Sequence, residues 1–307
     1  MTESVLECRD LVKVYAVGSI RRRRIEALRG VTLSVHRGDV YGFLGENGAG
    51  KTTTIRCLLG LTHPTSGEMR VFGRDRPGPR ELFSRAAYCP EESNFFTGIT
   101  GRELLRLYGR LHGLAGAELE KRVDRALDEV DLRKNADRRI EGYSKRMRQR
   151  VGLAQAVLPQ PELIILDEPA RGLDPVGRRR FRDVILDHAA RGTTFFINSH
   201  TLSEVERTCT RVGIIKSGRV IRELAPRDLV EDPEALEIIY EIPGEPLGGS
   251  ERADGQGFRL RVQGTAAMAE AAAEIARRGG RVESAGTLRK SLEDYFIQVV
   301  GDEDVVS

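Results

Sequence analysis

GENGAGKT occupies residues 45–52 and matches the pattern G-x-x-x-x-G-K-[ST] of phosphate-binding loops. The apolar run before it, residues 40–44, predicts a β-strand, and residues 51–59 predict a helix that ends at Gly60. This is the strand, loop and helix order that the motif requires. The sequence therefore predicts a βα unit that binds a phosphorylated nucleotide.

The residue types of this loop suit phosphate chemistry. Glycines let successive backbone N–H groups converge on phosphate oxygens, and the N-terminus of the following helix adds positive potential. Lys51 is placed to neutralise the β and γ phosphates of ATP, and the Thr52 hydroxyl is placed to reach Mg²⁺. The residues expected to contact the nucleotide are Gly45, Asn47, Gly48, Ala49, Gly50, Lys51, Thr52 and Thr53.

A second candidate site follows the apolar run at residues 163–166, which ends in two adjacent carboxylates, Asp167 and Glu168. Sheets of α/β proteins bind ligands at the carboxyl ends of their strands. Asp167 suits the Mg²⁺ shell, and Glu168, pointing to the other side, suits a base that orients the attacking water. A solvated acidic turn is the alternative, which the phosphate loop elsewhere in the chain disfavours.

Composition limits the classes of protein that remain. The 307 residues suffice for one large domain with an appendage or for two ordinary domains. The net charge of +3 does not by itself favour a polyanionic partner, and the four cysteines form no CxxC pair, which is typical of reduced cytosolic thiols. No apolar run approaches the roughly 20 residues of a membrane span, and the N-terminus has no export signal. We therefore expect a cytoplasmic protein.

The pattern of apolar residues predicts an α/β core. Residues 4–15 and 27–35 predict an antiparallel pair of strands, and Thr100 with Glu103 predicts a capping box that begins a helical region. Strand and helix then alternate, which favours parallel strands joined by crossover helices. The alternating segments are residues 163–166, 175–190, 193–197 and 201–210.

The composition changes near residue 225, where prolines become frequent and residues 244–257 form a loop. The later strands and helices predict a small α+β module at 226–307, separate from a first domain at 1–225. Its expected elements are strands at 235–242, 258–263 and 281–285 and helices at 265–278 and from about 290.

Two further motifs complete a recognisable series, namely DEPARGLDP at 167–175 and FINSH at 196–200. Over residues 4–222 the chain resembles the nucleotide-binding subunit of ABC transporters. The resemblance implies a P-loop NTPase cassette: a mixed and parallel sheet core, an antiparallel β subdomain, and a helical subdomain at about 92–160. It also implies that Tyr15 stacks on adenine, that Asp174 touches a partner subunit, and that His200 lies near the γ-phosphate.

The segment EGYSKRMRQR, residues 141–150, aligns with the Leu-Ser-Gly-Gly-Gln signature of that family, which contacts the ATP of the other subunit in a head-to-tail dimer. Ser144 keeps the hydroxyl at a helix N-cap. Arg146 replaces the second glycine, where a long side chain is expected to crowd the phosphate. An arginine also offers charge-assisted hydrogen bonds to the same phosphate, so we expect hydrolysis to be retained.

A further departure lies at Glu91, where the family has a glutamine that touches Mg²⁺ and the transport partner; Glu91 still offers an oxygen ligand. Phe95 and Phe96 follow, and they predict either burial in the chain's own core or a groove for the membrane subunit. Arg21–Arg24 predict a solvated loop, with a membrane surface or nucleic acid as alternatives. The tail around Leu292, Tyr295 and Phe296 is similar to that of ATPases that serve ABC-2 exporters, and we expect it to close a small core.

The sequence thus predicts a cytoplasmic Mg-ATPase that dimerises around two ATP molecules at the membrane and drives a separate permease, and the resemblance favours an exporter. Catalysis is assigned to Glu168, His200 and Lys51, and metal binding to Thr52, Glu91 and Asp167. A soluble ABC protein acting on ribosomes or nucleic acid is the alternative; it usually has two cassettes or a long coiled coil, and the sequence shows one phosphate loop and no sustained heptads. A regulator that binds but does not hydrolyse ATP is a third possibility, which rests on Arg146 alone.

Overall fold

The computed structural model describes residues 3–17, 23–92, 94–229, 235–253, 257–287 and 291–304. Contacts between residues divide the chain into two units, Met1–Pro226 and Arg227–Ser307.

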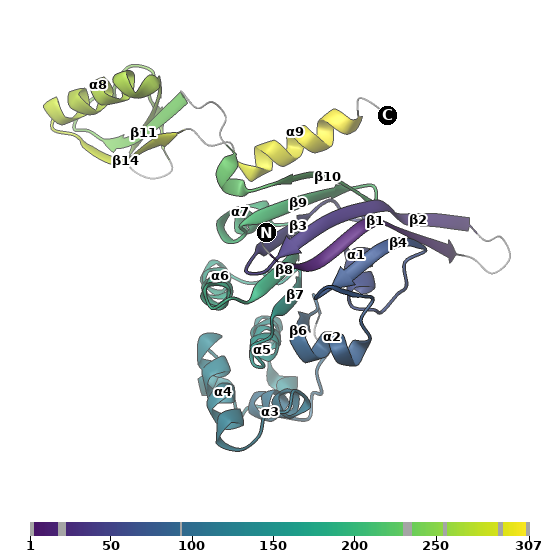
Figure 1. The fold of residues 1–307 in the computed structure, drawn as a ribbon. Coiled ribbons are helices and arrows are strands. Elements are labelled where there is room, and N and C mark those ends of the chain that lie inside the picture. Colours follow the sequence, from purple (N-terminus) through teal and green to yellow (C-terminus); the bar gives the residue numbers. More distant parts are fainter. Residues whose placement is uncertain are drawn as a thin grey trace. The chain divides into compact units, whose positions relative to one another are not determined.

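A six-stranded sheet forms the centre of the first unit (Figure 1), in the order β10-β9-β3-β8-β7-β6. Its strands are β3 (Val40–Leu44), β6 (Ala86–Cys89), β7 (Leu163–Asp167), β8 (Thr194–Ser199), β9 (Arg211–Lys216) and β10 (Arg219–Leu224). All neighbouring pairs are parallel except β9 and β10, which are antiparallel. The predicted parallel strands at 163–166 and 193–197 are therefore confirmed, and both extend further toward the carboxyl edge than predicted.

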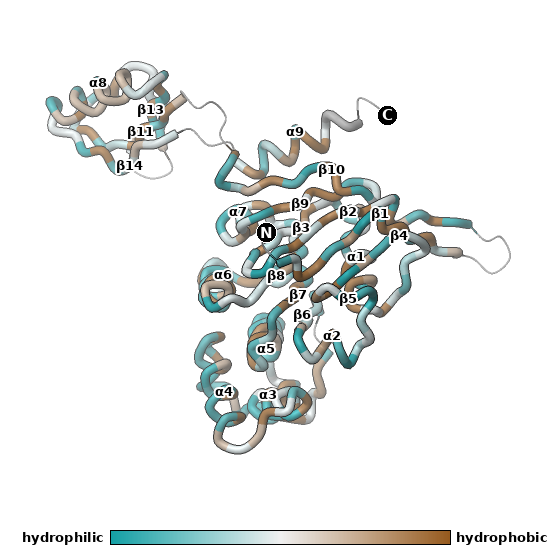
Figure 2. Tube along the Cα trace, in the orientation of Figure 1, coloured by the Kyte–Doolittle hydropathy of each residue, from teal (hydrophilic) through white to brown (hydrophobic). Residues whose placement is uncertain are grey.

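The central strands are hydrophobic along their whole length because both faces of the sheet are covered. Every residue of β3, β7 and β8 is buried, as is usual for parallel strands between layers, and hydrophobic residues follow these strands in Figure 2. In the parallel register Leu44 lies opposite Ser199, and Asp167 lies opposite Asn198. The phosphate loop and the two carboxylates therefore leave the sheet at the same edge.

Four helices of the first unit flank these strands along the chain: α1 (Lys51–Leu58) follows β3, α2 (Pro79–Arg85) precedes β6, α6 (Pro175–Ala190) joins β7 to β8, and α7 (Leu202–Thr208) joins β8 to β9. A second sheet, in the order β2-β1-β4-β5, consists of β1 (Ser4–Val17), β2 (Arg23–His36), β4 (Ser66–Val71) and β5 (Arg74–Asp75). The predicted antiparallel pairing of β1 with β2 is confirmed. Arg23 and Arg24 belong to β2 rather than to a loop, whereas Arg21 and Arg22 lie outside the described residues.

The helical region contains α3 (Gly101–Leu111), α4 (Gly116–Glu129), α5 (Lys145–Val157) and two short 3₁₀ turns, η1 (Arg133–Asn135) and η2 (Ile140–Gly142). The predicted capping box at its start is confirmed, because Thr100 Oγ1 accepts from the Glu103 backbone N–H and the Glu103 carboxylate accepts from the Thr100 backbone N–H. In Figure 1 these helices gather beyond the end of the sheet that β6 and β7 form.

Glu162 fixes the start of β7, the strand that ends in Asp167. Its carboxylate accepts from Arg85 at 2.5 and 2.9 Å and pairs with Arg37 at 2.8 Å. Hydrogen bonds from Arg85 and then Arg37 lower the pKa of Glu162 to about 2. Because the folded-state pKa lies below the ordinary value, this cluster stabilises the fold at neutral pH, and its contribution is lost as the pH falls toward 2.

The second unit is a four-stranded antiparallel sheet with a helix against it. The strands, in the order β12-β13-β11-β14, are β11 (Ala235–Glu241), β12 (Glu251–Arg252), β13 (Phe258–Gln263) and β14 (Arg281–Thr287), and the helices are α8 (Gly264–Arg277) and α9 (Leu292–Asp304). The buried core consists of Ile238, Tyr240, Leu260 and Ile275. The expectation that Leu292, Tyr295 and Phe296 close this core is not confirmed, because the core cluster among the described residues contains none of them.

All four cysteines are buried, and none of them forms a disulfide. Within the described ranges, no helix combines the length and the apolar character that crossing a bilayer requires.

Candidate nucleotide-binding and catalytic site

The phosphate loop takes a conformation that only glycine accommodates at several positions. Gly48 and Gly50 have φ values of 85° and 112°, in the left-handed region that favours glycine. A Cβ atom at Gly45 would lie 2.3 Å from the backbone oxygen of Ile215 on β9. The backbone of the loop is therefore shaped by its contact with the sheet, and α1 begins directly after it at Lys51.

Lys51 is buried, with only 7% of its surface exposed. Its ammonium donates to the backbone oxygens of Gly45 at 2.6 Å and Glu46 at 3.0 Å. Burial lowers the pKa of Lys51, and the nearby carboxylates of Glu168 and Asp167 oppose that shift. The ammonium thus lies between the loop and the two carboxylates, where a phosphate would offer a stronger acceptor than a neutral carbonyl.

Asp167 is fixed by groups on the strands beside it. Its Oδ1 accepts from Asn198 Nδ2 at 2.5 Å, and its Oδ2 lies 3.5 Å from the hydroxyl of Tyr88. Burial raises the pKa of Asp167, and it raises the pKa of Tyr88 to about 12 with a further contribution from Asp167. Within the described residues, Asn198 Oδ1 is buried without a hydrogen-bond partner.

Asn198 and Tyr88 were not predicted as site residues. The signal that could have identified Asn198 is its polar side chain after the apolar residues Phe195–Ile197. Once β7 and β8 are known to be parallel neighbours, their register places Asn198 opposite Asp167.

Glu168 follows β7 in a left-handed conformation, with φ of 50°. Such a conformation costs a non-glycine residue about 1–2 kcal/mol and therefore needs support from its surroundings. The Glu168 backbone N–H donates to the Asn198 backbone oxygen at 2.9 Å, and Gln149 Nε2 donates to the Glu168 backbone oxygen at 3.2 Å. The strained backbone thereby fixes the direction in which this carboxylate leaves the sheet.

The Glu168 side chain meets His200. Its Oε2 lies 2.6 Å from His200 Nδ1 and 3.4 Å from the His200 backbone nitrogen. Glu168 is 8% exposed, whereas the His200 side chain is 52% exposed. A nearly buried carboxylate is thus held by a histidine that faces solvent.

Ser144, Arg146 and Asp174 form a second group of predicted site residues. Ser144 caps α5 by accepting from the Met147 backbone N–H at 3.3 Å, and Asp174 caps α6 by accepting from the Gly177 backbone N–H at 2.7 Å. The Arg146 guanidinium pairs with Asp174 at 2.7 Å. The Gly177 N–H and then the Arg146 charge lower the pKa of Asp174. Arg146 therefore has a counter-ion within its own chain.

Glu91, expected as a metal ligand, forms an ion pair with Arg171, a residue of the DEPARGLDP segment that was not predicted to have a role. The prediction that Phe95 and Phe96 are both buried in the core of the chain is wrong, because Phe96 is 70% exposed and Phe95 is half-buried.

Tyr15 is half-buried on β1, and the Lys13 ammonium lies 4.9 Å from the centre of its ring.

The structure therefore brings Lys51, Asp167, Glu168 and His200 together at the carboxyl edge of the central sheet, with Thr52 exposed at the start of α1. Among the described residues, no side-chain hydrogen bond or ion pair joins this cluster to the group of Ser144, Arg146 and Asp174.

Comparison with known proteins identifies relatives of this chain. The family model described as "ABC transporter" matches residues 28–171. An uncharacterised ABC transporter ATP-binding protein of Nostoc sp. is 36% identical over 99% of this chain and 92% of its own length. The Nod factor export ATP-binding protein I of Burkholderia lata is 37% identical over 69% of this chain and 70% of its own.

The fold is also similar to that of a solved ATP-binding subunit of an ABC transporter. That structure superposes with a TM-score of 0.66 at 33% sequence identity, covering 73% of this chain and 91% of the other.

Proposed function

Because the chain belongs to the ATP-binding proteins of ABC transporters, we propose that two copies enclose ATP with Mg²⁺ and hydrolyse it to drive a separate membrane permease. The observation that carries the proposal is the contact between Glu168 and His200, 2.6 Å long, at the sheet edge that also presents Lys51 and Asp167. This arrangement has a phosphate-binding cation, a metal-type carboxylate and a candidate base in one place.

Phosphate binding falls to the loop and to Lys51. The backbone N–H groups of residues 45–52 and the N-terminus of α1 favour an anion. Lys51 needs only to exchange the carbonyl oxygens of Gly45 and Glu46 for phosphate oxygens. Asn47, Gly48, Ala49 and Thr53 line or follow this loop, and Tyr15 is proposed to stack on the adenine.

The residues present fit Mg²⁺. This ion prefers oxygen ligands and is usually held by one or two carboxylates together with substrate phosphates and water. Asp167 supplies a carboxylate that Asn198 and Tyr88 orient, and the hydroxyl of Thr52 is exposed beside the loop. When bound there, Mg²⁺ neutralises charge that develops on the phosphate oxygens.

Glu168 is the proposed base. Both contacts of His200 go to Oε2, so Oε1 is left to accept a hydrogen bond from the attacking water. The His200 side chain is half exposed, so it remains accessible to the γ-phosphate that it is proposed to sense. Lys51 offsets the charge that develops in the transition state.

The second copy completes the site. Ser144 and Arg146, at the start of α5, lie at an exposed helix N-terminus suited to the γ-phosphate of ATP in the other subunit. Arg146 would have to leave Asp174 to make that contact, or else remain with Asp174 and leave the phosphate to Ser144 and the helix N-terminus.

The permease is proposed to bind near the helical region at the cytoplasmic face of the membrane. Phe96 and Leu111 are 70% and 72% exposed there, and large exposed apolar side chains often mark a docking surface. Export is the proposed direction, supported by the name of the Burkholderia lata relative. The named relatives favour transport over the soluble alternative that acts on ribosomes or nucleic acid.

The test is Glu168→Gln in the full-length chain. This variant should bind ATP with parental affinity and form a dimer when saturated with it, while its phosphate release falls by at least about a hundredfold, the usual contribution of a general base. Turnover at the parental rate would remove Glu168 from its role. A variant that stays monomeric in saturating ATP, with its permease present, would contradict the proposed dimer.

A further inference from the structure

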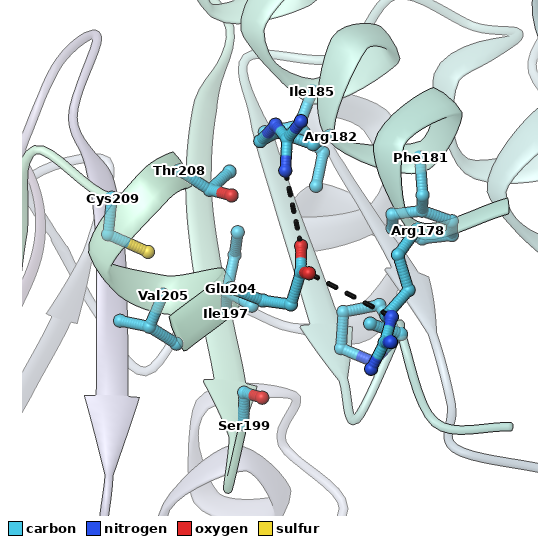
Figure 3. Close-up of a pocket in the computed structure, with 12 residues that line it drawn as sticks. Arg178, Phe181, Arg182, Ile185, Ile197, Ser199, Glu204, Val205, Thr208 and Cys209 are labelled. Carbon is cyan, nitrogen blue, oxygen red and sulfur yellow. Dashed lines mark ion pairs between the residues drawn. The ribbon is translucent and has the colours of Figure 1, made fainter. Parts of the chain in front are cut away.

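Glu204 lies in the first turn of α7, four residues after His200, and contacts two arginines of α6. Its carboxylate forms ion pairs with both, which are dashed in Figure 3, at 3.9 Å from Arg178 Nε and 3.6 Å from Arg182 Nη1. The side chains of Glu204 and Arg182 are only 18% and 19% exposed. Arg178 and Arg182 are four residues apart and thus share one face of α6.

A small crevice, partly open to solvent and about 30 Å³ in volume, lies between α6 and α7, with Phe181 and Ile185 of α6 on one side and Val205 of α7 on the other (Figure 3). This volume is about the share of liquid that one water molecule occupies, so the apolar side chains leave a small gap between the two helices. The ion pairs of Glu204 lie across this crevice and connect α7 to α6.

The position of α7 bears directly on the candidate base. All of β8 up to Ser199 is buried in the sheet, and α7 begins at Leu202. The two residues between them are therefore held by the sheet at one end, and at the other end their position follows that of α7. His200 is one of these two residues. A shift of α7 therefore changes the distance between His200 Nδ1 and Glu168 Oε2, which is 2.6 Å in this structure.

We propose that Glu204 is a positioning residue for hydrolysis: held by Arg178 and Arg182, it keeps α7 against α6 and thereby holds His200 on Glu168. The inference rests on the proposed roles of Glu168 and His200. Since Asp174 caps the start of α6, the ion pairs of Glu204 connect the loop expected to touch the second subunit with the histidine that touches the base. Assembly of the dimer would in this way be communicated to the base through α6 and α7.

Glu204→Gln is the first test, because it keeps the shape of the side chain and removes its charge. The expected result is a fall in kcat of roughly tenfold with KM for ATP within about twofold of the parent, as for a small misplacement of a catalytic group. Glu206→Gln is the matched control: it makes the same change on the same helix, and no ion pair of Glu206 occurs among the described residues. It should leave kcat within about twofold, and an equal loss in both variants would overturn the proposal.

A double-mutant cycle with His200→Ala separates positioning from general stability. If Glu204 acts through His200, Glu204→Gln should lower the rate in the parent but cause no further loss in the His200→Ala background. The same loss in both backgrounds would show a merely structural role and overturn the inference. The proposed function is tested separately: if Glu168→Gln is inactive while Glu204→Gln equals the parent, only the role of Glu204 fails.

Discussion

The two halves of the proposed ATP site are built differently. The half that contains Lys51, Asp167 and Glu168 is buried, and its shape is set by backbone contacts with neighbouring strands. The half that contains Ser144 and Arg146 is exposed and is held by a helix cap and one ion pair. The phosphate loop and the strand that ends in Asp167 and Glu168 keep the motifs of the family, whereas the segment of Ser144 and Arg146 departs from its signature at Arg146.

The physical reason lies in how much added side-chain volume each half of the site tolerates. In the buried half a single added methyl group at Gly45 meets a backbone oxygen at 2.3 Å, which cannot move without distorting β9. In the exposed half Arg146 has replaced a glycine, and Asp174 supplies a compensating charge at 2.7 Å. Close packing thus fixes the sequence of one half, while exposed ion pairs allow the other half to vary.

The largest expected effect comes from Gly45→Ala, which breaks the buried half. Overpacking against the Ile215 backbone oxygen should lower the free energy of unfolding by about 3 kcal/mol and distort the phosphate loop. We expect ATP affinity to fall at least about a hundredfold, equivalent to about 2.7 kcal/mol. Denaturant unfolding and calorimetric titration with ATP measure the two effects.

Gly60→Ala is the matched control for this variant. Gly60 follows the C-cap residue of α1 and has a φ of 68°, and an added Cβ would meet nothing within 4 Å. The backbone strain alone should cost about 1 kcal/mol of stability and leave ATP binding unchanged. If Gly45→Ala bound ATP as tightly as Gly60→Ala, crowding would not be what fixes the buried half.

Arg146→Gly restores the family residue in the exposed half and should have a smaller effect. Because Asp174 holds the guanidinium, the arginine need not obstruct the approach of phosphate, and steady-state ATP turnover should change by less than about tenfold. Arg148→Gly, an equally exposed position on α5, controls for the loss of helix propensity. An Arg146→Gly enzyme about a hundredfold faster than the parent would instead show that the arginine is an obstacle.

The same difference explains what could be predicted from the sequence. The strand before Asp167 and the phosphate loop were predictable, because continuous apolar runs and fixed glycine spacing report burial and backbone shape. The elements between residues 60 and 100, including β4, α2 and β6, were not predicted. β6 has 4 residues and α2 has 7, too few for a hydrophobic period to be counted in the sequence. In β4 the buried hydrophobic residues are Met69 and Val71, again too few for a pattern.

Ion pairs between distant segments were also beyond prediction. Arg171 and Glu91 are 80 positions apart, and no sequence motif links the two residues. Their pairing depends on β6 lying beside β7. The contact between Glu204 and α6 likewise requires knowledge of how two crossover helices pack. A local pattern records which residues are buried, but it does not record which exposed charges meet.

The smallest expected effect concerns this pair of Glu91 and Arg171. An exposed ion pair contributes at most about 1 kcal/mol, so Glu91→Gln and Arg171→Ala should each leave the free energy of unfolding within that range. Their effects on the Mg²⁺ concentration needed for half-maximal ATP turnover should differ in sign if Glu91 is a metal ligand. Glu91→Gln would raise that concentration a few-fold, and Arg171→Ala, by freeing the carboxylate, would lower it. If neither variant changes the Mg²⁺ requirement, Glu91 serves only as the counter-ion of Arg171, and the metal site consists of Asp167 and Thr52 with the nucleotide.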